Sequence, residues 1–312
     1  MPRLRETSSN VVRGFLMGSA DIVPGVSGGT VALVLGIYRR LVSAIRNGSS
    51  ALGRFARLDA RGGVRGLREV EWVFLIPLLA GIGLAIVTLS HLVETLLEER
   101  PVELAGLFLG LVLGSTIVAW RLLTVRDSLR LAALAVTAVV VFLLLGLREG
   151  TSEDTVTQLS DPALWAFFGA GAVAICAMIL PGISGSFFLV ILGMYSAVLG
   201  AVNDRDLVAL GVFVAGCVLG LALFSQVLHW ALGRHYDTIM AVLIGLMVGS
   251  LRVLWPWPLG VESTSLGTPA SPVVLPVVLA VAGMAVVVGF DRVARGAEDR
   301  TTEEEQEDLQ AT

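Results

Sequence analysis

Long stretches without charge decide what this chain can fold into. From Pro162 to Asn203 the sequence has no charged residue. Several other apolar runs reach roughly 17 residues or more, the length that a helix needs to cross a bilayer. These runs are continuous and do not alternate between apolar and polar residues, which excludes a transmembrane β-barrel. With 55% hydrophobic and 15% charged residues, the sequence predicts an all-α polytopic membrane protein.

Two of the apolar runs are interrupted by the same kind of helix-breaking motif. The first is Asp21-Ile-Val-Pro24-Gly25-Val-Ser27-Gly28-Gly29-Thr30, and the second is Leu180-Pro181-Gly182-Ile-Ser184-Gly185-Ser186. Proline and glycine end a helix, and irregular backbone is tolerated at membrane depth only where protein or a wet cavity surrounds it. A single break would most often be a packing kink, but the second copy favours a function for both.

The two breaks belong to a duplication that covers most of the chain. An offset of 157 residues, as from Gly14 to Gly171, aligns the breaks, and an offset of 135 aligns the segments that follow. The change of offset is explained if the Arg-rich loop of the first half is longer. The aligned pairs are Gly14/Gly171, Pro24/Pro181, Gly25/Gly182, Ser27/Ser184, Gly28/Gly185, Gly36/Gly193, Tyr38/Tyr195, Gly81/Gly216, Ser90/Ser225, Gly110/Gly245, Gly114/Gly249 and Trp120/Trp255.

The distribution of arginine sets the expected topology, because arginine-rich loops stay in the cytoplasm. Arginine flanks the first broken segment, whereas the linkers near 94–103 and 148–161 are acidic and are expected outside. Each half then crosses the membrane an odd number of times, so the second half is inverted relative to the first. Many secondary transporters have this plan, with a site near the midplane where broken helices meet. We expect a multi-pass plasma-membrane protein with both termini in the cytoplasm.

The expected boundaries follow from the same features. The first repeat covers 1–150, with a broken or re-entrant hairpin at about 14–46, an Arg-rich cytoplasmic loop at 39–71, and membrane helices at about 72–93, 103–120 and 131–147. The second repeat covers 151–292, with a hairpin at about 163–200 and helices at about 207–232, 238–257 and 272–290. Residues 293–312 form an acidic tail that is expected to be disordered. Whether the hairpins are re-entrant or cross the membrane fully is left open.

The breaks supply groups that bind an anion. A helix that follows such a break begins with unpaired N–H groups and the positive end of its dipole, and the glycines leave room for a ligand. Two such ends that meet from opposite faces would form a pseudo-symmetric anion site. The candidate anion-binding residues are Pro24, Gly25, Ser27, Gly28, Gly29, Thr30, Pro181, Gly182, Ser184, Gly185 and Ser186.

Two charged residues are further candidates. Asp21 is the one carboxylate well inside the first broken segment, and an acid there either marks a proton or cation pathway or caps a helix at the interface. Arg252 either extends outward to the membrane surface or serves as a phosphate partner. The cysteines and histidines have no metal-ligand spacing, so neither a metal nor another cofactor is expected.

At these motifs the sequence resembles the polyprenyl-phosphate translocase family PopT. The resemblance lies in Ala20 to Thr30, Leu35-Gly36-Ile-Tyr38 and Leu180 to Ser186, and it extends over nearly the whole chain except the acidic tail. It implies a lipid-carrier flippase that returns undecaprenyl phosphate, or a related polyprenyl phosphate, from the outer to the inner leaflet for cell-wall assembly. The implied partners are this lipid and the surrounding membrane lipids, with no nucleic acid; a homo-oligomer is left open.

The physics of the substrate suggests coupling to a cation. A phosphomonoester carries about −1.5 to −2 charges at neutral pH, and moving it toward the negative side of a membrane costs roughly 2.3 kcal/mol per charge per 100 mV. Protons or another cation are therefore expected to accompany it, with Asp21 as the candidate carrier. The main alternative is a small-anion channel or exchanger that uses the same breaks. An intramembrane enzyme is disfavoured, because the sequence lacks a phosphatase constellation and Asp21 lacks a partner carboxylate.

Overall fold

The computed structural model describes residues 2–22, 27–57, 59–146, 162–182, 185–260 and 266–310. Within these ranges all regular secondary structure is helical. Six helices are long and apolar enough to cross a membrane, which confirms the predicted all-α membrane fold. They are α5 (Trp72–Glu99), α6 (Pro101–Leu122), α7 (Ser128–Gly146), α11 (Leu207–Arg234), α12 (Tyr236–Ser250, continued by a 3-10 helix over Leu251–Leu254) and α13 (Val274–Gln310).

Each predicted break separates a long helix from a short one. Two residues after each short helix ends lies a glycine, Gly36 or Gly193, with the same positive φ of 68°, a conformation that glycine adopts without a steric penalty. The backbone turn closes in the same way in both halves, since Gly36 N–H bonds to the Leu33 carbonyl and Gly193 N–H to that of Val190. The helices are α1 (Pro2–Asp21), α2 (Gly28–Val34) and α3 (Tyr38–Ala56), then α8 (Leu164–Ile179), α9 (Gly185–Ile191) and α10 (Tyr195–Asn203).

The first long helix of each half packs on the first crossing helix that follows it. α1 lies against α5, and α8 lies against α11. A Cβ atom on Gly14 would lie 1.9 Å from the carbonyl oxygen of Leu78, and one on Gly171 would lie 2.3 Å from that of Phe213. Only glycine allows such close approach of two helix backbones. The aligned glycines therefore make the same contact in both halves.

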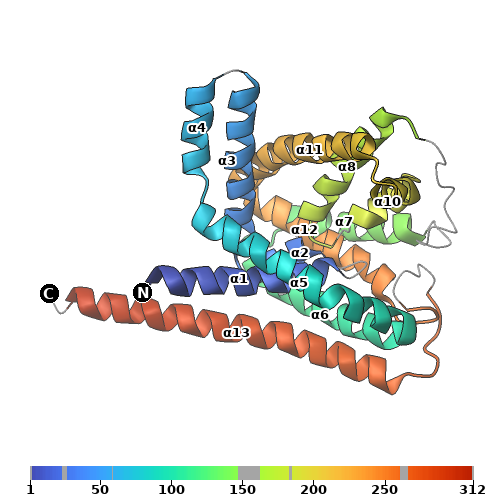
Figure 1. Cartoon of the computed structure of the whole chain (residues 1–312). Coiled ribbons are helices and arrows are strands. Elements are labelled where there is room, and N and C mark those ends of the chain that lie inside the picture. The colour runs from blue at the N-terminus through green and yellow to red at the C-terminus, as the bar shows by residue number, and fades with distance from the viewer. Residues whose placement is uncertain are drawn as a thin grey trace.

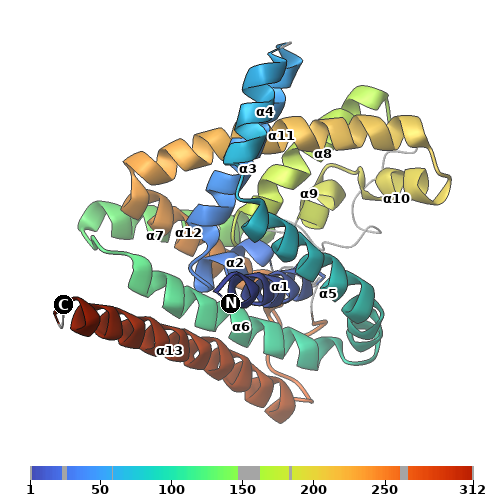
Figure 2. The same cartoon turned by 60° about the vertical axis from the view of Figure 1, so that its left-hand side comes forward.

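The last crossing helix of each half packs on the other half. α13 lies along α6, and α7 lies along α12 (Figure 2). Gly110 on α6 faces the backbone of Ala280 on α13, and Gly245 on α12 faces that of Leu134 on α7. Because α6 and α12 also contact each other, they form the most buried layer of the six crossing helices. Each half therefore supplies the helix that covers a crossing helix of the other half.

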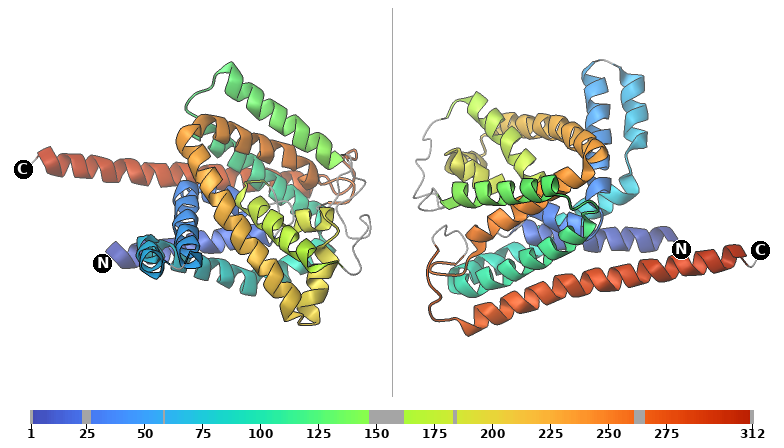
Figure 3. Two further views of the ribbon diagram at one scale, coloured as in Figure 1. Left: turned by 90° about the horizontal axis from the view of Figure 1, so that it is seen from above. Right: turned by 180° about the vertical axis from the view of Figure 1, so that it is seen from behind.

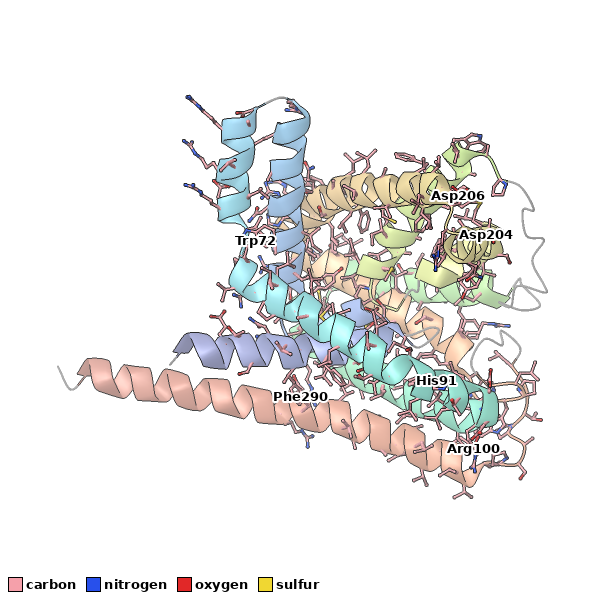
Figure 4. The ribbon with its side chains drawn as sticks, viewed as in Figure 1. Trp72, His91, Arg100, Asp204, Asp206 and Phe290 are labelled. Atoms are coloured by element: carbon pink, nitrogen blue, oxygen red, sulfur yellow. The ribbon has the colours of Figure 1, made fainter. Side chains whose placement is uncertain are left out.

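The two broken segments approach the interior from opposite ends of the bundle. Both termini lie at one end of the bundle (Figure 1). Trp72, at the start of α5, lies toward the same end (Figure 4). Arg100, Asp204 and Asp206 lie toward the opposite end (Figure 4). α1 starts at the first end and α8 at the second (Figure 3). An inverted repeat would have this arrangement; the inverted repeat and its orientation in a membrane stay predictions.

Two segments differ from the expectations. The predicted Arg-rich loop contains a helical hairpin made of α3 and α4 (Ala60–Glu69). It forms because Gly66 lets α4 approach Ala51 of α3 closely, a long-range contact that local sequence does not reveal. The acidic tail, predicted to be disordered, continues α13 to Gln310, since Glu, Gln and Arg are good helix formers.

Candidate functional site

The first break is closed by a contact between its two sides. Asp21 ends α1, and its Oδ1 atom accepts a hydrogen bond of 2.6 Å from the backbone N–H of Gly28, the first residue of α2. The Oγ atom of Ser27 accepts a second one from the N–H of Gly29, at 3.1 Å. A carboxylate bound to a helix-terminal N–H is a charge-assisted hydrogen bond. An anionic oxygen atom therefore already occupies this end of α2.

The two breaks are joined by direct hydrogen bonds. The Ser27 hydroxyl lies 3.2 Å from the Met178 carbonyl oxygen and 3.3 Å from that of Leu180, and it donates its one proton to either of them. In the other direction, the N–H of Gly182 donates to Oγ1 of Thr30 at 3.0 Å. These bonds satisfy backbone groups that the end of α8 leaves without helical partners. The two breaks are therefore in direct contact, whereas the anion site that was predicted between them stays a prediction.

Tyr38 adds a third link that the sequence analysis left out of the site. Its hydroxyl donates to the carbonyl oxygen of Ile179 at 3.2 Å. Tyr38 is 3% exposed, while Ser27 and Thr30 are each 1% exposed, so all three hydroxyls are shielded from solvent. The alignment of Tyr38 with Tyr195 was a signal for its role, because a buried hydroxyl that recurs next to each break needs a partner there.

The second break lies against α12. Gly182 has a φ of 83°, and a Cβ atom there would lie 2.9 Å from Cα of Met247. Pro181 and Gly182 are both buried. Pro24, Gly25 and Ser184 lie outside the described residues, and Ser186 is placed only as part of the α9 backbone. Their predicted roles stay predictions.

The two breaks differ in the side chain that lies over the start of the short helix. A Cβ atom on Gly28 would lie 2.4 Å from Oδ2 of Asp21, and one on the aligned Gly185 would lie 2.5 Å from Cγ of Met178. The same space is therefore filled by a carboxylate in the first half and by a thioether chain in the second. Only the first half places a charged group at the break.

Arg252 lies on the 3-10 helix after α12, where its guanidinium group stacks over the ring of Phe142 at 4.7 Å. It also covers Gly146, because a Cβ atom there would lie 2.5 Å from Cζ of Arg252. Both neighbours belong to α7. These two contacts of Arg252 are both with α7, and its part in binding phosphate stays a prediction.

A second cationic group ties three helices together at the end that carries the termini. Arg40 at the start of α3 pairs with Glu6 of α1 at 2.9 Å and with Glu71 before α5 at 2.7 Å, and it stacks over Phe74. Burial lowers the pKa of Arg40, but its bonds to Glu6 and Glu71 outweigh this, so the pKa is raised overall. The pairing holds the start of α3 against α1 and α5.

The described residues contain no group of three His, Cys, Asp or Glu side chains that could hold a metal ion. The site consists of hydroxyls, backbone N–H groups and one carboxylate, drawn from both halves of the chain. The hydroxyl and N–H groups of this arrangement are donors of the kind that an anion accepts from, and the predicted anion site stays a prediction.

Comparison with known proteins decides the family. Residues 17–268 match the family described as undecaprenyl phosphate translocase-like. This chain belongs to that family. Two proteins named polyprenyl-phosphate transporter also resemble the chain over most of its length. The transporter of Vibrio cholerae is 40% identical over 250 residues, which are 80% of this chain and 78% of that one. The transporter of Staphylococcus aureus is 31% identical over 258 residues, 79% of this chain and 86% of its own.

No solved structure matches this translocase-like chain significantly. Family membership agrees with the expected transporter and with the expectation that the chain is not an enzyme. Both breaks, Asp21 to Thr30 and Leu180 to Ser186, fall inside the matched range.

Proposed function

We propose that this protein transports polyprenyl phosphate and returns it from the outer to the inner leaflet, with the phosphate held between the two breaks. The relatives named as polyprenyl-phosphate transporters support the substrate. The observation that carries the site is the direct bonding of the breaks, in which Ser27 and Thr30 meet the end of α8 inside the bundle. Undecaprenyl phosphate is the substrate that the family description favours.

The groups at the breaks suit a phosphate. The Gly28 N–H already donates to an anionic oxygen atom, and hydroxyl groups such as those of Ser27 and Thr30 donate equally well to phosphate oxygens. In the conformation described, these groups bond to the protein itself. Binding therefore requires an exchange, in which the phosphate takes over partners that the breaks now supply to each other. The long isoprenoid tail stays in lipid while the headgroup crosses.

Asp21 is the proposed carrier of the proton that offsets the negative charge of the transported phosphate. Carrying about 1.5 to 2 negative charges inward against 100 mV costs roughly 3.5–4.6 kcal/mol. A proton taken up by the Asp21 carboxylate would weaken its bond with the Gly28 N–H, so that a phosphate could compete for this donor, and would reduce the net charge that moves. We therefore propose proton coupling through Asp21, with another cation as the alternative carrier.

The proposed location is the plasma membrane, with both termini in the cytoplasm. α3 and α4, which are rich in arginine, lie toward the end that carries the termini (Figure 1), which fits the preference of arginine for the cytoplasmic side. Cleavage by an added protease of tags on either terminus, in intact cells and in permeabilised cells, tests the orientation. Cleavage in intact cells would contradict it.

The transport proposal is tested with purified protein in liposomes that carry polyprenyl phosphate in the outer leaflet. We expect Asp21→Asn to lower the rate of inward movement at least about tenfold, as loss of a charge-assisted hydrogen bond would, and to flatten its pH dependence. Met178→Leu is the matched control, because the aligned position is apolar. Ser27→Ala combined with Ser184→Ala tests the hydroxyls of the breaks. Wild-type rates in both the Asn variant and the double variant would remove these residues from the site.

The same liposomes separate the transporter from a small-anion channel or exchanger. Chloride or inorganic phosphate flux without movement of the lipid would contradict the proposed function. Movement of lipid without such flux would support it.

A further inference from the structure

α1 has a row of polar side chains on one face, which runs from near its N-terminus toward the first break. Glu6, Asn10 and Arg13 are spaced by three or four residues and so share one face of the helix. Met17 and Asp21 continue the same face toward the break. Because α1 packs along α5, the polar side chains on this face need hydrogen-bond or ion-pair partners. The three residues differ in how fully they are paired.

Asn10 is fully buried and only half satisfied. Its exposed fraction is 0%, and its Oδ1 atom accepts a hydrogen bond of 3.2 Å from Nη1 of Arg13. A guanidinium group only donates hydrogen bonds, so this contact fixes which end of the amide is oxygen. Nδ2 of Asn10 has no hydrogen-bond partner among the residues that the structure describes. Two buried N–H donors therefore lack an acceptor, a rare and unfavourable condition in a folded protein.

Arg13 brings a positive charge to the same place. Among the described residues no carboxylate lies within ion-pair distance of Arg13, and its one bond is to Asn10. Glu6, the acid in the same row, is bound to Arg40. Arg13 is half-buried, so its guanidinium group is partly removed from water without compensation by a carboxylate. Together with Nδ2 of Asn10 it offers several N–H donors and one charge, but no acceptor.

The fold does not require these polar groups. At the aligned offset, Phe167 and Ala170 take the places of Asn10 and Arg13 on α8, and both are buried in an apolar cluster. α8 nevertheless packs on α11 as α1 packs on α5. Since apolar residues serve the same packing role in the second half, the polar pair in the first half has a reason beyond packing.

We propose that Asn10 and Arg13 form a second phosphate site, which takes a phosphomonoester group between the break and the end of the bundle that carries the termini. The phosphate oxygens would accept from Nδ2 of Asn10 and from the guanidinium group of Arg13, which suits the planar geometry of such donors. Arg13 precedes Asp21 by eight residues, about 12 Å along a helix. This proposal rests on the proposed function. It adds a second binding site on the transport path, which the headgroup occupies either before or after it binds at the break.

Binding to the full-length protein in detergent tests this site. The probes are farnesyl phosphate, a short isoprenyl monophosphate, and inorganic phosphate, each titrated by calorimetry. We expect Arg13→Gln and Asn10→Leu each to weaken the binding of farnesyl phosphate about tenfold, as the loss of one charge-assisted contact would. Arg57→Gln, which removes an exposed arginine, is the charge-matched control and should bind as the wild type does.

Thermal unfolding of Asn10→Leu separates a ligand site from a structural role. Leucine removes the unsatisfied amide, so the unfolding temperature should stay the same or rise while the affinity falls. If Asn10→Leu or Arg13→Gln binds both probes as tightly as the wild type, the second site is overturned, and Asn10 is served by a buried water molecule. Loss of affinity for both probes assigns the site to the phosphate group alone, and loss for farnesyl phosphate only assigns it to a lipid headgroup.

The two proposals fail differently. If the wild type neither binds farnesyl phosphate nor moves polyprenyl phosphate in liposomes, the proposed function fails. If the wild type does both and the Asn10 and Arg13 variants match it, only the second site fails.

Discussion

The two halves of the chain have the same framework and different chemistry. Gly14 and Gly171 make the same backbone contact, and both short helices are followed by a turn glycine with the same φ. At five aligned positions along the broken segments, however, the first half has a polar side chain and the second half an apolar one. The aligned pairs are Asn10/Phe167, Arg13/Ala170, Asp21/Met178, Thr30/Phe187 and Arg40/Ala197.

This difference teaches which residues the fold needs and which it does not. The positions where two helix backbones come into close contact are glycine in both halves, so these glycines define the shared framework. The polar side chains at these five positions occur in the first half only, and at the aligned positions of the second half apolar residues take their places. We infer that the polar groups of the first half handle the substrate, whereas the second half mainly supplies the backbone of α8 that receives them.

The largest expected effect tests the shared framework. Gly14→Ala and Gly171→Ala would each place a Cβ atom within 2.3 Å of a carbonyl oxygen on the neighbouring helix. Overpacking of this kind costs about 1–3 kcal/mol or more, so both variants should lower the unfolding temperature in detergent by similar amounts. Gly211→Ala, which meets open space, is the control. A large loss in only one half would show that the framework is not shared.

The next effect tests the polar side of the comparison. Thr30→Val leaves the N–H of Gly182 without its acceptor in a buried place, at a cost of about 1–3 kcal/mol. Lipid movement in liposomes should fall roughly tenfold or more. Thr116→Val is the control, because that hydroxyl bonds within its own helix. Equal rates in the two variants would mean that the link between the breaks does not matter for transport.

Tyr38→Phe should have a smaller effect. It removes the bond to the Ile179 carbonyl and leaves an unpaired acceptor, which is tolerated better than an unpaired donor. We expect a loss of about 1 kcal/mol in the free energy of unfolding. Tyr195→Phe provides the aligned comparison in the second half. A loss above that of Thr30→Val would contradict this ranking of the links.

The smallest effect concerns Arg40, which has no counterpart in the second half. Its pairs with Glu6 and Glu71 are partly exposed, and such pairs contribute less than about 1 kcal/mol. Arg40→Gln should therefore lower the unfolding temperature slightly at low salt and hardly at all at high salt, because salt screens exposed charges. The same loss at both salt concentrations would mean that packing over Phe74 matters more than charge.

Local sequence predicted the crossing helices and the breaks well, because hydropathy and helix-breaking residues act over a few neighbouring positions. The helix that starts at Trp72, for example, was expected at that residue. The α3–α4 hairpin was missed, because it depends on the contact of Gly66 with Ala51 across a turn. The position of Arg252 over Phe142 likewise depends on how α7 and α12 pack.

The candidate site was predicted in its residues but not in its connections. Ser27 and Thr30 were expected to face a ligand, and they are seen bonded to the opposite break. Asp21 was left between two interpretations, and the structure places its carboxylate on Gly28 N–H as a cap; its part in coupling stays a proposal. Sequence reveals which groups donate and accept, whereas their partners depend on the meeting of segments about 150 residues apart.

The crossed packing of the last helices has a consequence for biosynthesis. The glycine face of α6, which includes Gly106 and Gly110, is covered by α13, the helix that the ribosome completes last. Until then, α6 must sit in the bilayer with lipid against a surface shaped for a helix backbone. Assembly of the first half therefore cannot finish before the second half has been inserted. A chain that stops before α13 should be recognised and degraded by the membrane quality-control machinery, even though every residue of the first break is present.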